Sequence, residues 1–196
     1  AVWVVTNWTL AGFWRLGVFG WSASLMLFWR LRGVSARPEK PGNLRAILPA
    51  MPVLFLPMAL FSLLRYPMME SLTTFLPTLM SQRGASLWAA GASFSILMIS
   101  GVVGVLAIGP ISDQIGRKPV LTAVTILSAG LALLFLNVSG AAAVIVLAVL
   151  GFVSLSTNPV MLAMVQEHFP NNRAMANGIY MMLNFALRPL GTILVG

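Results

Sequence analysis

Residues 109–120 decide the fold of this chain, and they read GPISDQIGRKPV. Asp113, Arg117 and Lys118 lie within six positions of one another here, although the whole chain of 196 residues has only twelve Lys and Arg and four Asp and Glu. Long apolar runs flank this segment on both sides. The pattern predicts a short charged turn between two apolar helices of membrane-spanning length.

The composition of the whole chain agrees with this prediction. Hydrophobic residues make up 59% of the sequence and charged residues 8%, whereas soluble domains carry about 25% charged residues. Several apolar runs approach or exceed the roughly 18 residues that mark a membrane-spanning helix. The sequence therefore predicts an all-α polytopic membrane protein that has the lipid bilayer as its partner.

The net charge of +8 does not indicate a nucleic-acid partner, because most Lys and Arg lie in short gaps between apolar runs, where they set membrane orientation. The chain has no cysteine and no G-x-x-x-x-G-K-[ST] phosphate loop, which argues against a Cys-based metal site and an ATP-driven pump. With four acidic residues and one His, it also lacks the paired carboxylates or nucleophile–base pair of a membrane enzyme. We therefore expect no enzymatic activity, cofactor or metal.

The apolar runs predict a series of helices separated by short polar gaps. Residues 32–45 are the one long polar segment, and we expect them to form a linker between two groups of helices. The predicted helices cover about 1–11 (the tail of one helix), 13–31, 46–82, 87–108, 119–136, 141–165 and 174 to the end.

The run over 46–82 allows two interpretations. As one helix it would be about 55 Å long, whereas the hydrocarbon core of a bilayer is about 30 Å thick, so two short helices hinged at RYPMME (65–70) are the alternative. The distribution of basic residues decides between them. With one helix, successive loops hold five, one, two, no and one Lys or Arg. The first, third and fifth loops, on one side of the membrane, then carry eight basic residues and the loops on the other side carry one, as the positive-inside rule requires. We therefore predict one long, kinked helix, with 32–45 and 109–118 both cytoplasmic.

The residues of the 109–118 segment suit a tight interhelical turn of about nine residues. Gly109 lets the preceding helix end, Asp113 could cap a helix N-terminus, and Arg117 and Lys118 could bind carbonyls or carboxylates. From the residues alone, a generic turn that obeys the positive-inside rule explains the segment equally well.

The segment also resembles the signature loop of the major facilitator superfamily, G-x-x-x-D-[RK]-x-G-[RK]-[RK]. In that family the loop joins the second and third helices and recurs between the eighth and ninth. Here it comes two helices after the polar linker, which matches the second copy. Gln114 stands where the family usually has a basic residue, so the resemblance does not extend to that cationic contact. The residues that match the signature are Gly109, Asp113, Gly116, Arg117 and Lys118.

A second segment, VQEHFPNNRAMANGIYMMLNFALR over 165–188, is similar to the connection between the tenth and eleventh helices of drug-efflux members. Together the two resemblances imply a fragment of about six transmembrane helices that runs from the end of helix 5 into a truncated helix 11. Residues 1–31 would end the N-terminal bundle, 32–45 would be the cytoplasmic central linker, and 46–196 would be an incomplete C-terminal bundle of helices 7–11. The missing N-terminal half of the transporter is then an expected partner.

The family resemblance implies a secondary active transporter of the cell membrane that works by alternating access. The 109–118 segment would act as a conformational latch, with Asp113 as its main residue and Arg117 second, and protons would be the coupling ion. The drug-efflux resemblance implies export of small, partly apolar compounds. An importer of a small polar metabolite within the same superfamily and a membrane helix bundle without transport are the alternatives.

Polar residues inside the apolar runs are candidates for the proton and substrate site, because charges in the membrane are costly. Arg65 and Glu70 lie about 140° apart on an ideal helix, so they need not pair, but a kink at Pro67 could bring them closer. Glu70 is the acidic candidate for a proton carrier. Snorkelling to an interface is the alternative for both charged residues.

Two later pairs lie on one helical face at i,i+4 spacing: Ser154 with Asn158, and Asn184 with Arg188. They could line a central cavity, although hydrogen bonds between packed helices explain Ser154 and Asn158 as well. An arginine inside a helix needs a partner or water. The glycines of the predicted spans, Gly101, Gly104 and Gly178, are expected to permit close helix packing. The predicted proton and substrate site therefore consists of Arg65, Glu70, Asn158, Asn184 and Arg188.

Overall fold

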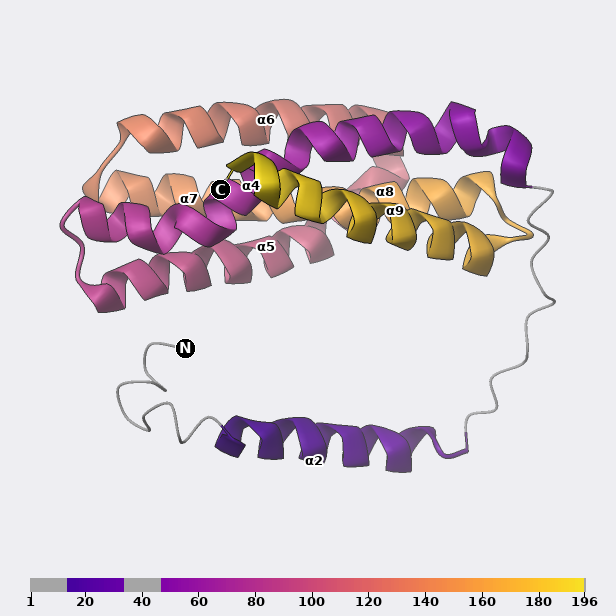
Figure 1. Ribbon diagram of the computed structural model, residues 1–196, viewed down its shortest axis with the longest axis horizontal. Helices are drawn as coiled ribbons and strands as arrows, with labels where there is room; N and C mark the ends of the chain where they lie inside the picture. The colour runs from indigo at the N-terminus through magenta and orange to yellow at the C-terminus, as the bar shows by residue number, and fades with distance from the viewer. Residues whose placement is uncertain (1–13, 34–46, 196) are drawn as a thin grey trace. The chain divides into compact units, whose positions relative to one another are not determined.

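The computed structural model describes residues 14–33 and 47–195. The chain separates into two units, residues 1–41 and 42–196. The described part of the first unit is the helix α2, Trp14–Leu31, which agrees with the helix predicted over 13–31 (Figure 1). The helix tail predicted at 1–11 and residues 34–45 of the predicted linker, with Arg37, Lys40 and Arg45, lie outside the described residues.

The described part of the second unit is a bundle of helices whose long axes run in roughly one direction (Figure 1). It begins with two short turns, a 3-10 helix (η2) over Leu48–Ala50 and a π-helix (η3) over Met51–Phe55. The α-helices that follow are α4 (Leu56–Gln82), α5 (Leu87–Ile115), α6 (Arg117–Asn137), α7 (Gly140–Leu155), α8 (Thr157–His168) and α9 (Arg173–Val195).

The run that was ambiguous in the sequence is one long helical span. The π-helical turn and α4 are continuous over Met51–Gln82, and α4 runs through both Pro67 and Pro77. Membrane helices tolerate proline because neighbouring groups satisfy the carbonyls that it leaves without a donor. The prediction of one long helix is confirmed, and the alternative of two helices hinged at 65–70 is wrong.

The fourth span is divided into two helices where the sequence predicted one continuous helix. The helix predicted over 141–165 is divided at Ser156, where α7 ends and α8 begins, and α8 continues to His168. Pro159 is the physical reason, because it has no N–H to donate to the carbonyl of Leu155 and so interrupts the regular hydrogen-bond pattern. The two helices still form one span, Gly140–His168.

The all-α membrane fold is confirmed. Within residues 14–33 and 47–195 there is no strand, and α2 has 18 residues, which is also of spanning length. The described part of the chain has five helical spans that are long and apolar enough to cross a bilayer: Met51–Gln82, Leu87–Ile115, Arg117–Asn137, Gly140–His168 and Arg173–Val195.

Small residues bring α5 and α7 close together. A Cβ atom added to Gly101 would collide with Leu155, and one added to Gly104 would collide with the backbone of Phe152. The predicted packing role of these two glycines is therefore confirmed. Gly178 makes no such contact with the described residues, because no atom of another described helix lies within 4 Å of the position that its Cβ would take.

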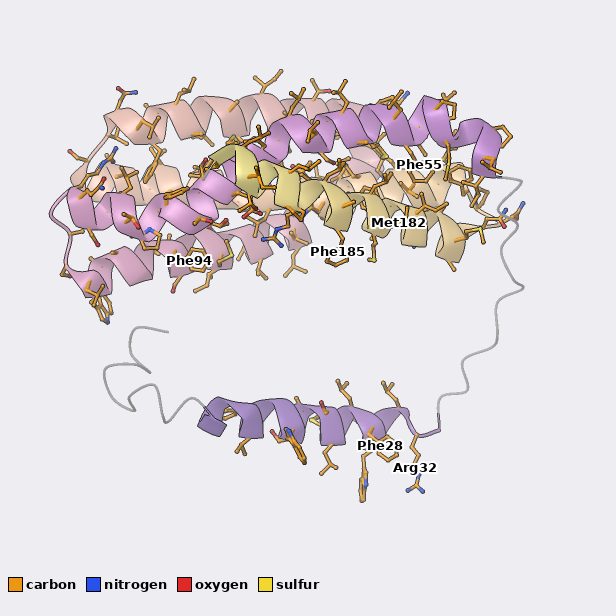
Figure 2. The ribbon with its side chains drawn as sticks, in the orientation of Figure 1. Phe28, Arg32, Phe55, Phe94, Met182 and Phe185 are labelled. Atoms are coloured by element: carbon orange, nitrogen blue, oxygen red, sulfur yellow. The ribbon has the colours of Figure 1, made fainter. Side chains whose placement is uncertain are left out.

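Buried apolar clusters hold α4 at both of its ends. Near its start, Phe55 stacks on Phe169 at 5.9 Å between ring centroids, next to the buried side chains of Met161 and Val165 on α8 (Phe55 is labelled in Figure 2). Near its other end, Leu76 packs in a cluster with residues of α5, α6 and α7. The middle of α4, between the two clusters, carries the segment RYPMME with its polar residues Arg65, Tyr66 and Glu70.

Candidate functional site

A cavity of about 600 Å³ lies beside the middle of α4, between that helix and residues of α5, α7, α8 and α9. Small-molecule sites have volumes of about 300–1,000 Å³, so the cavity is large enough for a metabolite or a small drug. The residues of the predicted proton and substrate site, Arg65, Glu70, Asn158, Asn184 and Arg188, all line it. The structure therefore brings together side chains that lie up to 123 positions apart in the sequence, from residue 65 to residue 188.

An ion pair joins α4 to α9 at this cavity. Nε of Arg188 lies 2.7 Å from Oε1 of Glu70. The side chain of Glu70 is 12% exposed and that of Arg188 is 62% exposed, so the arginine reaches from the open side of the cavity to an almost buried carboxylate. The predicted need of Arg188 for a partner is met by Glu70.

Close backbone contact makes this ion pair possible. Gly191, one turn after Arg188 on α9, lies directly against Tyr66 and Pro67 of α4, and there is no space for a Cβ atom. Without that contact the two helices would be held apart by side chains. Gly191 was not singled out in the sequence, although its position after Pro189 in an apolar run is typical of a close helix crossing.

Arg65 has different partners from Glu70. Its Nη2 donates a hydrogen bond to the backbone carbonyl of Ser154, in the last turn of α7, where helix carbonyls lack intrahelical donors. Its Nε is buried with no hydrogen-bond partner among the described residues. Pro67 thus does not bring Arg65 and Glu70 into an ion pair, and each charge is turned toward a different helix.

The two polar pairs predicted from i,i+4 spacing behave differently. Asn184 accepts a hydrogen bond from the hydroxyl of Tyr66 and donates to the carbonyl of Tyr180 at 2.8 Å, so it bonds across α4 and α9. Oγ of Ser154 is buried and has no partner in the described part of the chain, so the predicted interhelical bond of this hydroxyl is not formed. Asn158 is exposed and lines the cavity.

The remaining walls of the cavity are apolar and flexible. They consist largely of methionine, leucine and phenylalanine side chains, which adapt to irregular ligands. Phe185 on α9, labelled in Figure 2, is 76% exposed and lines the cavity. The other apolar side chains that line the cavity are Met69, Met98, Leu155, Leu162 and Met181.

The segment that resembles the signature loop is mostly helical, so the predicted nine-residue turn is wrong. The helix α5 continues through Pro110 to Ile115, and Gly109 lies inside it instead of ending it. Gly116 alone separates α5 from α6, with a φ of +106°. That backbone conformation is strained for residues with a side chain, so one glycine achieves the sharp turn for which a longer loop was expected.

Arg117 is the centre of a charged cluster at this turn. Its Nη2 lies 2.5 Å from Oδ1 of Asp113, its Nε lies 2.9 Å from Oε1 of Glu167, and its Nη1 donates to Oγ of Ser112 at 2.9 Å. The cluster therefore ties the end of α5 and the start of α6 to the end of α8. We refer to Asp113, Arg117 and Glu167 as the turn cluster.

The turn cluster agrees with part of the sequence prediction. Arg117 does bind carboxylates as predicted. Asp113 does not cap a helix, since no side chain caps the N-terminus of α6. Lys118 is exposed and forms no ion pair with the described residues. A second cavity, of about 780 Å³, lies next to the cluster and is bounded by the starts of α4 and α6 and the end of α8.

Two residues that the sequence analysis did not assign to a site prove to be structural. Tyr66 stands between Arg65 and Pro67 and bonds to Asn184; its place in the RYPMME segment was the signal that could have found it. Arg83, counted only as a loop charge, donates to the carbonyls of Leu136 at 2.8 Å and Val138 at 3.1 Å. It therefore closes the C-terminal end of α6, where helix carbonyls attract cations.

Comparison with known families gives a match over nearly the whole chain. The model described as Major Facilitator Superfamily matches residues 1–192. Comparisons with curated proteins and with solved structures found no match. Among the described residues, no group of three His, Asp or Glu side chains could hold a metal ion.

Proposed function

Because this chain belongs to the major facilitator superfamily, we propose that the cavity beside α4 is its substrate path and that proton movement at Glu70 drives transport by alternating access. Membership of the family makes the chain a multi-pass membrane transporter with a small-molecule substrate. The proposal adds the coupling ion and the residues that couple it to the substrate.

The observation that carries the proposal is the ion pair between Glu70 and Arg188. Glu70 is almost buried in the middle of the long span Met51–Gln82, and its one charged contact lies on another helix. A proton on Glu70 would remove the attraction that holds Arg188 at 2.7 Å and would loosen the contact between α4 and α9. Intramembrane carboxylates that pair across helices are the usual elements of proton relays in transporters.

The turn cluster supports alternating access at a second place. We propose that Asp113 and Arg117 act as a latch on the cytoplasmic side, which the N-terminal half of the full transporter would contact in one of its two states. Gly109, Gly116 and Lys118 complete the signature. In this assignment the protein lies in the cell membrane, residues 32–45 are the cytoplasmic central linker, and α4 to α9 correspond to helices 7–11 of the family.

Two directions of transport have separate support. Export of small, partly apolar compounds is supported by the similarity of residues 165–188 to drug-efflux members and by the apolar cavity walls. Import of a small polar metabolite is supported by the charged and hydrogen-bonding side chains in the same cavity, where Arg65 and Arg188 would suit a polar or charged molecule.

The test uses the full-length protein in inverted membrane vesicles with an imposed proton gradient and a panel of dyes and antibiotics. For an exporter we expect gradient-dependent uptake that a protonophore abolishes, and that Glu70→Gln loses. The matched control is Glu39→Gln, the same substitution in the predicted linker, which should keep uptake. Uptake that persists in Glu70→Gln would remove this residue from the mechanism. If inverted vesicles take up none of the dyes and antibiotics, and right-side-out vesicles show gradient-dependent uptake of a metabolite, the protein is an importer.

A further inference from the structure

The charges around the cavity do not balance. Its described lining holds two arginines, Arg65 and Arg188, against one carboxylate, Glu70. Arg188 is compensated by Glu70, whereas none of the described carboxylates forms an ion pair with Arg65. One positive charge is therefore left without a counter-charge in a membrane-spanning region, where water cannot easily compensate it.

The hydrogen bonds around Arg65 are incomplete as well. One nitrogen of the guanidinium group donates to the carbonyl of Ser154, while Nε and the neighbouring Oγ of Ser154 have no partners in the described structure. Buried polar groups are nearly always paired, and a buried charge without a partner is more costly than a neutral group. Nε of Arg65 is thus a buried donor for which the described residues supply no acceptor, and the guanidinium group carries five potential donors in all.

The rest of the cavity wall indicates what would bring the missing acceptor. The same cavity is lined by Met98, Leu155, Leu162 and Phe185, which favour an apolar or aromatic body. Arginine binds planar oxyanions through two parallel hydrogen bonds, which gives it both affinity and geometric selectivity. A molecule that carries an anionic oxygen group on a small apolar body matches both parts of the cavity.

We propose that the substrate of this transporter is a small organic anion whose oxygen head group binds Arg65 and whose apolar part lies against the methionine and leucine side chains of the cavity. The proposal rests on the proposed function, in which the cavity is the substrate path, and names the class of molecule that uses it. It competes with a simpler explanation, that a carboxylate from outside the described residues neutralises Arg65.

Three aromatic probes of nearly the same shape test the proposal: benzoate, benzamide and benzamidine, which are negative, neutral and positive near neutral pH. Binding is measured by ligand-observed NMR on the full-length protein in lipid nanodiscs, with no proton gradient. We expect saturable binding of benzoate that is about tenfold or more tighter than binding of benzamide, because a hydrogen bond to a charged group exceeds a neutral one by this amount. Benzamidine should bind most weakly.

Variants of Arg65 show whether the preference comes from this residue. Arg65→Gln should lose the preference for benzoate, and Arg65→Lys, which keeps the charge, should retain it in weakened form. Arg173→Gln is the matched control, because Arg173 begins the same helix that carries Arg188 but does not line the cavity. Thermal melting of each variant checks that it is folded. If Arg65→Gln does not fold, comparing the binding of the three probes to Arg65→Lys and to the unmodified protein still decides whether the preference for benzoate comes from Arg65.

Some results would overturn the proposal. The proposal is wrong if the three probes bind equally or if benzamidine binds most tightly. It is also wrong if benzoate shows no saturable binding, or if the preference for benzoate survives in Arg65→Gln. If a carboxylate from another segment neutralises Arg65, we expect the three probes to bind equally. Since binding is measured without a gradient, failure of proton-driven transport would leave the anion site standing, and failure of the anion site would leave proton coupling standing.

Discussion

The ion pair in the cavity and the turn cluster contain the same kinds of side chains in opposite surroundings. In the cavity, Glu70 is 12% exposed and has one partner, Arg188, from a helix 118 residues away. In the turn cluster, Arg117 is 18% exposed and lies between two carboxylates that are each 59% exposed. The first pair is therefore sensitive to the loss of either partner, whereas the second is shared and lies near water.

This contrast indicates different roles. A carboxylate with a single partner in a membrane span must either keep its partner or take up a proton, which suits a coupling step. A three-residue cluster at a helix end can lose one contact and keep the other, which suits a contact that forms and breaks as the halves of a transporter move. The predictions below test that division of roles, beginning with the largest expected effect.

Removing Arg188 should have the largest consequence. In Arg188→Gln the carboxylate of Glu70 loses its charged partner, and we expect transport to fall by about two orders of magnitude and the free energy of unfolding to fall by about 2 kcal/mol. Vesicle transport and thermal unfolding measure the two effects. The double variant Glu70→Gln with Arg188→Gln should recover stability but not transport. Full transport in Arg188→Gln would show that the pair has no role in coupling.

The affinity for benzoate should depend on the negative charge of Glu70. Glu70→Gln removes the one negative charge among the described residues that line the cavity and leaves the positive charges of Arg65 and Arg188 in place. We expect benzoate to bind this variant up to about tenfold more tightly than the unmodified protein, as NMR titrations at a single pH would show.

The sign of this effect also bears on the direction of transport. Glu70→Gln has the charge of a protonated glutamate, so tighter binding in this variant means that proton and anion favour each other's binding, and this reciprocal coupling is what cotransport requires. The result would favour import over export. Weaker binding of benzoate in Glu70→Gln would contradict the expected linkage and would fit exchange of substrate for protons.

Substitutions in the turn cluster should affect stability less. Arg117→Gln removes two partly exposed ion pairs, and exposed pairs contribute about 0.2–1 kcal/mol each, so we expect the free energy of unfolding to fall by about 1 kcal/mol. Transport should fall severalfold because the latch is weakened. Lys118→Gln is the matched control for stability, since Lys118 forms no ion pair with the described residues, and it should melt like the unmodified protein. A loss of stability in Arg117→Gln as large as in Arg188→Gln would refute the contrast between the two regions.

The smallest expected effect is that of salt on the stability contributed by the two regions. The Debye length falls from about 10 Å at 0.1 M to about 3 Å at 1 M, so the exposed turn cluster is screened more strongly than the cavity pair. We expect the stability difference between Arg117→Gln and the unmodified protein to shrink by a few tenths of a kcal/mol in 1 M NaCl. The corresponding difference for Arg188→Gln should change little, and melting curves at both salt concentrations compare them.

Much of the fold could be predicted because long apolar runs and basic gaps determine membrane helices directly. The uncertain points were helix ends. Gly109 and Pro110 break helices in water, but α5 passes through both, since a helix in a membrane loses more by exposing its backbone than by accommodating a proline. Conversely, the break at Ser156 depends on one proline inside an apolar run, and nothing in the periodicity distinguishes it from Pro110.

The candidate site could be predicted as a set of residues but not as a set of contacts. Arg65, Glu70 and Arg188 were conspicuous because charged residues are rare in apolar runs. Their pairing depends on the crossing of α4 and α9 at Gly191, which is a tertiary contact that no local pattern contains. Arg65 and Glu70 are close in sequence, which made an ion pair between them conceivable. In the structure each has its partner on another helix.

The central claim, that substrate passes through the cavity beside α4 by alternating access, can be tested by labelling a single cysteine, because the chain has no cysteine of its own. Asn158→Cys places a thiol at an exposed position of the cavity lining, and Leu64→Cys, at a side chain that is 73% exposed outside that lining, is the lipid-facing control. We expect that a membrane-impermeant thiol reagent labels Asn158→Cys from both sides of the membrane, that a proton gradient shifts the two rates in opposite directions, and that Leu64→Cys stays unlabelled. Labelling of Asn158→Cys from one side only, at a rate independent of the gradient, would contradict alternating access through this cavity.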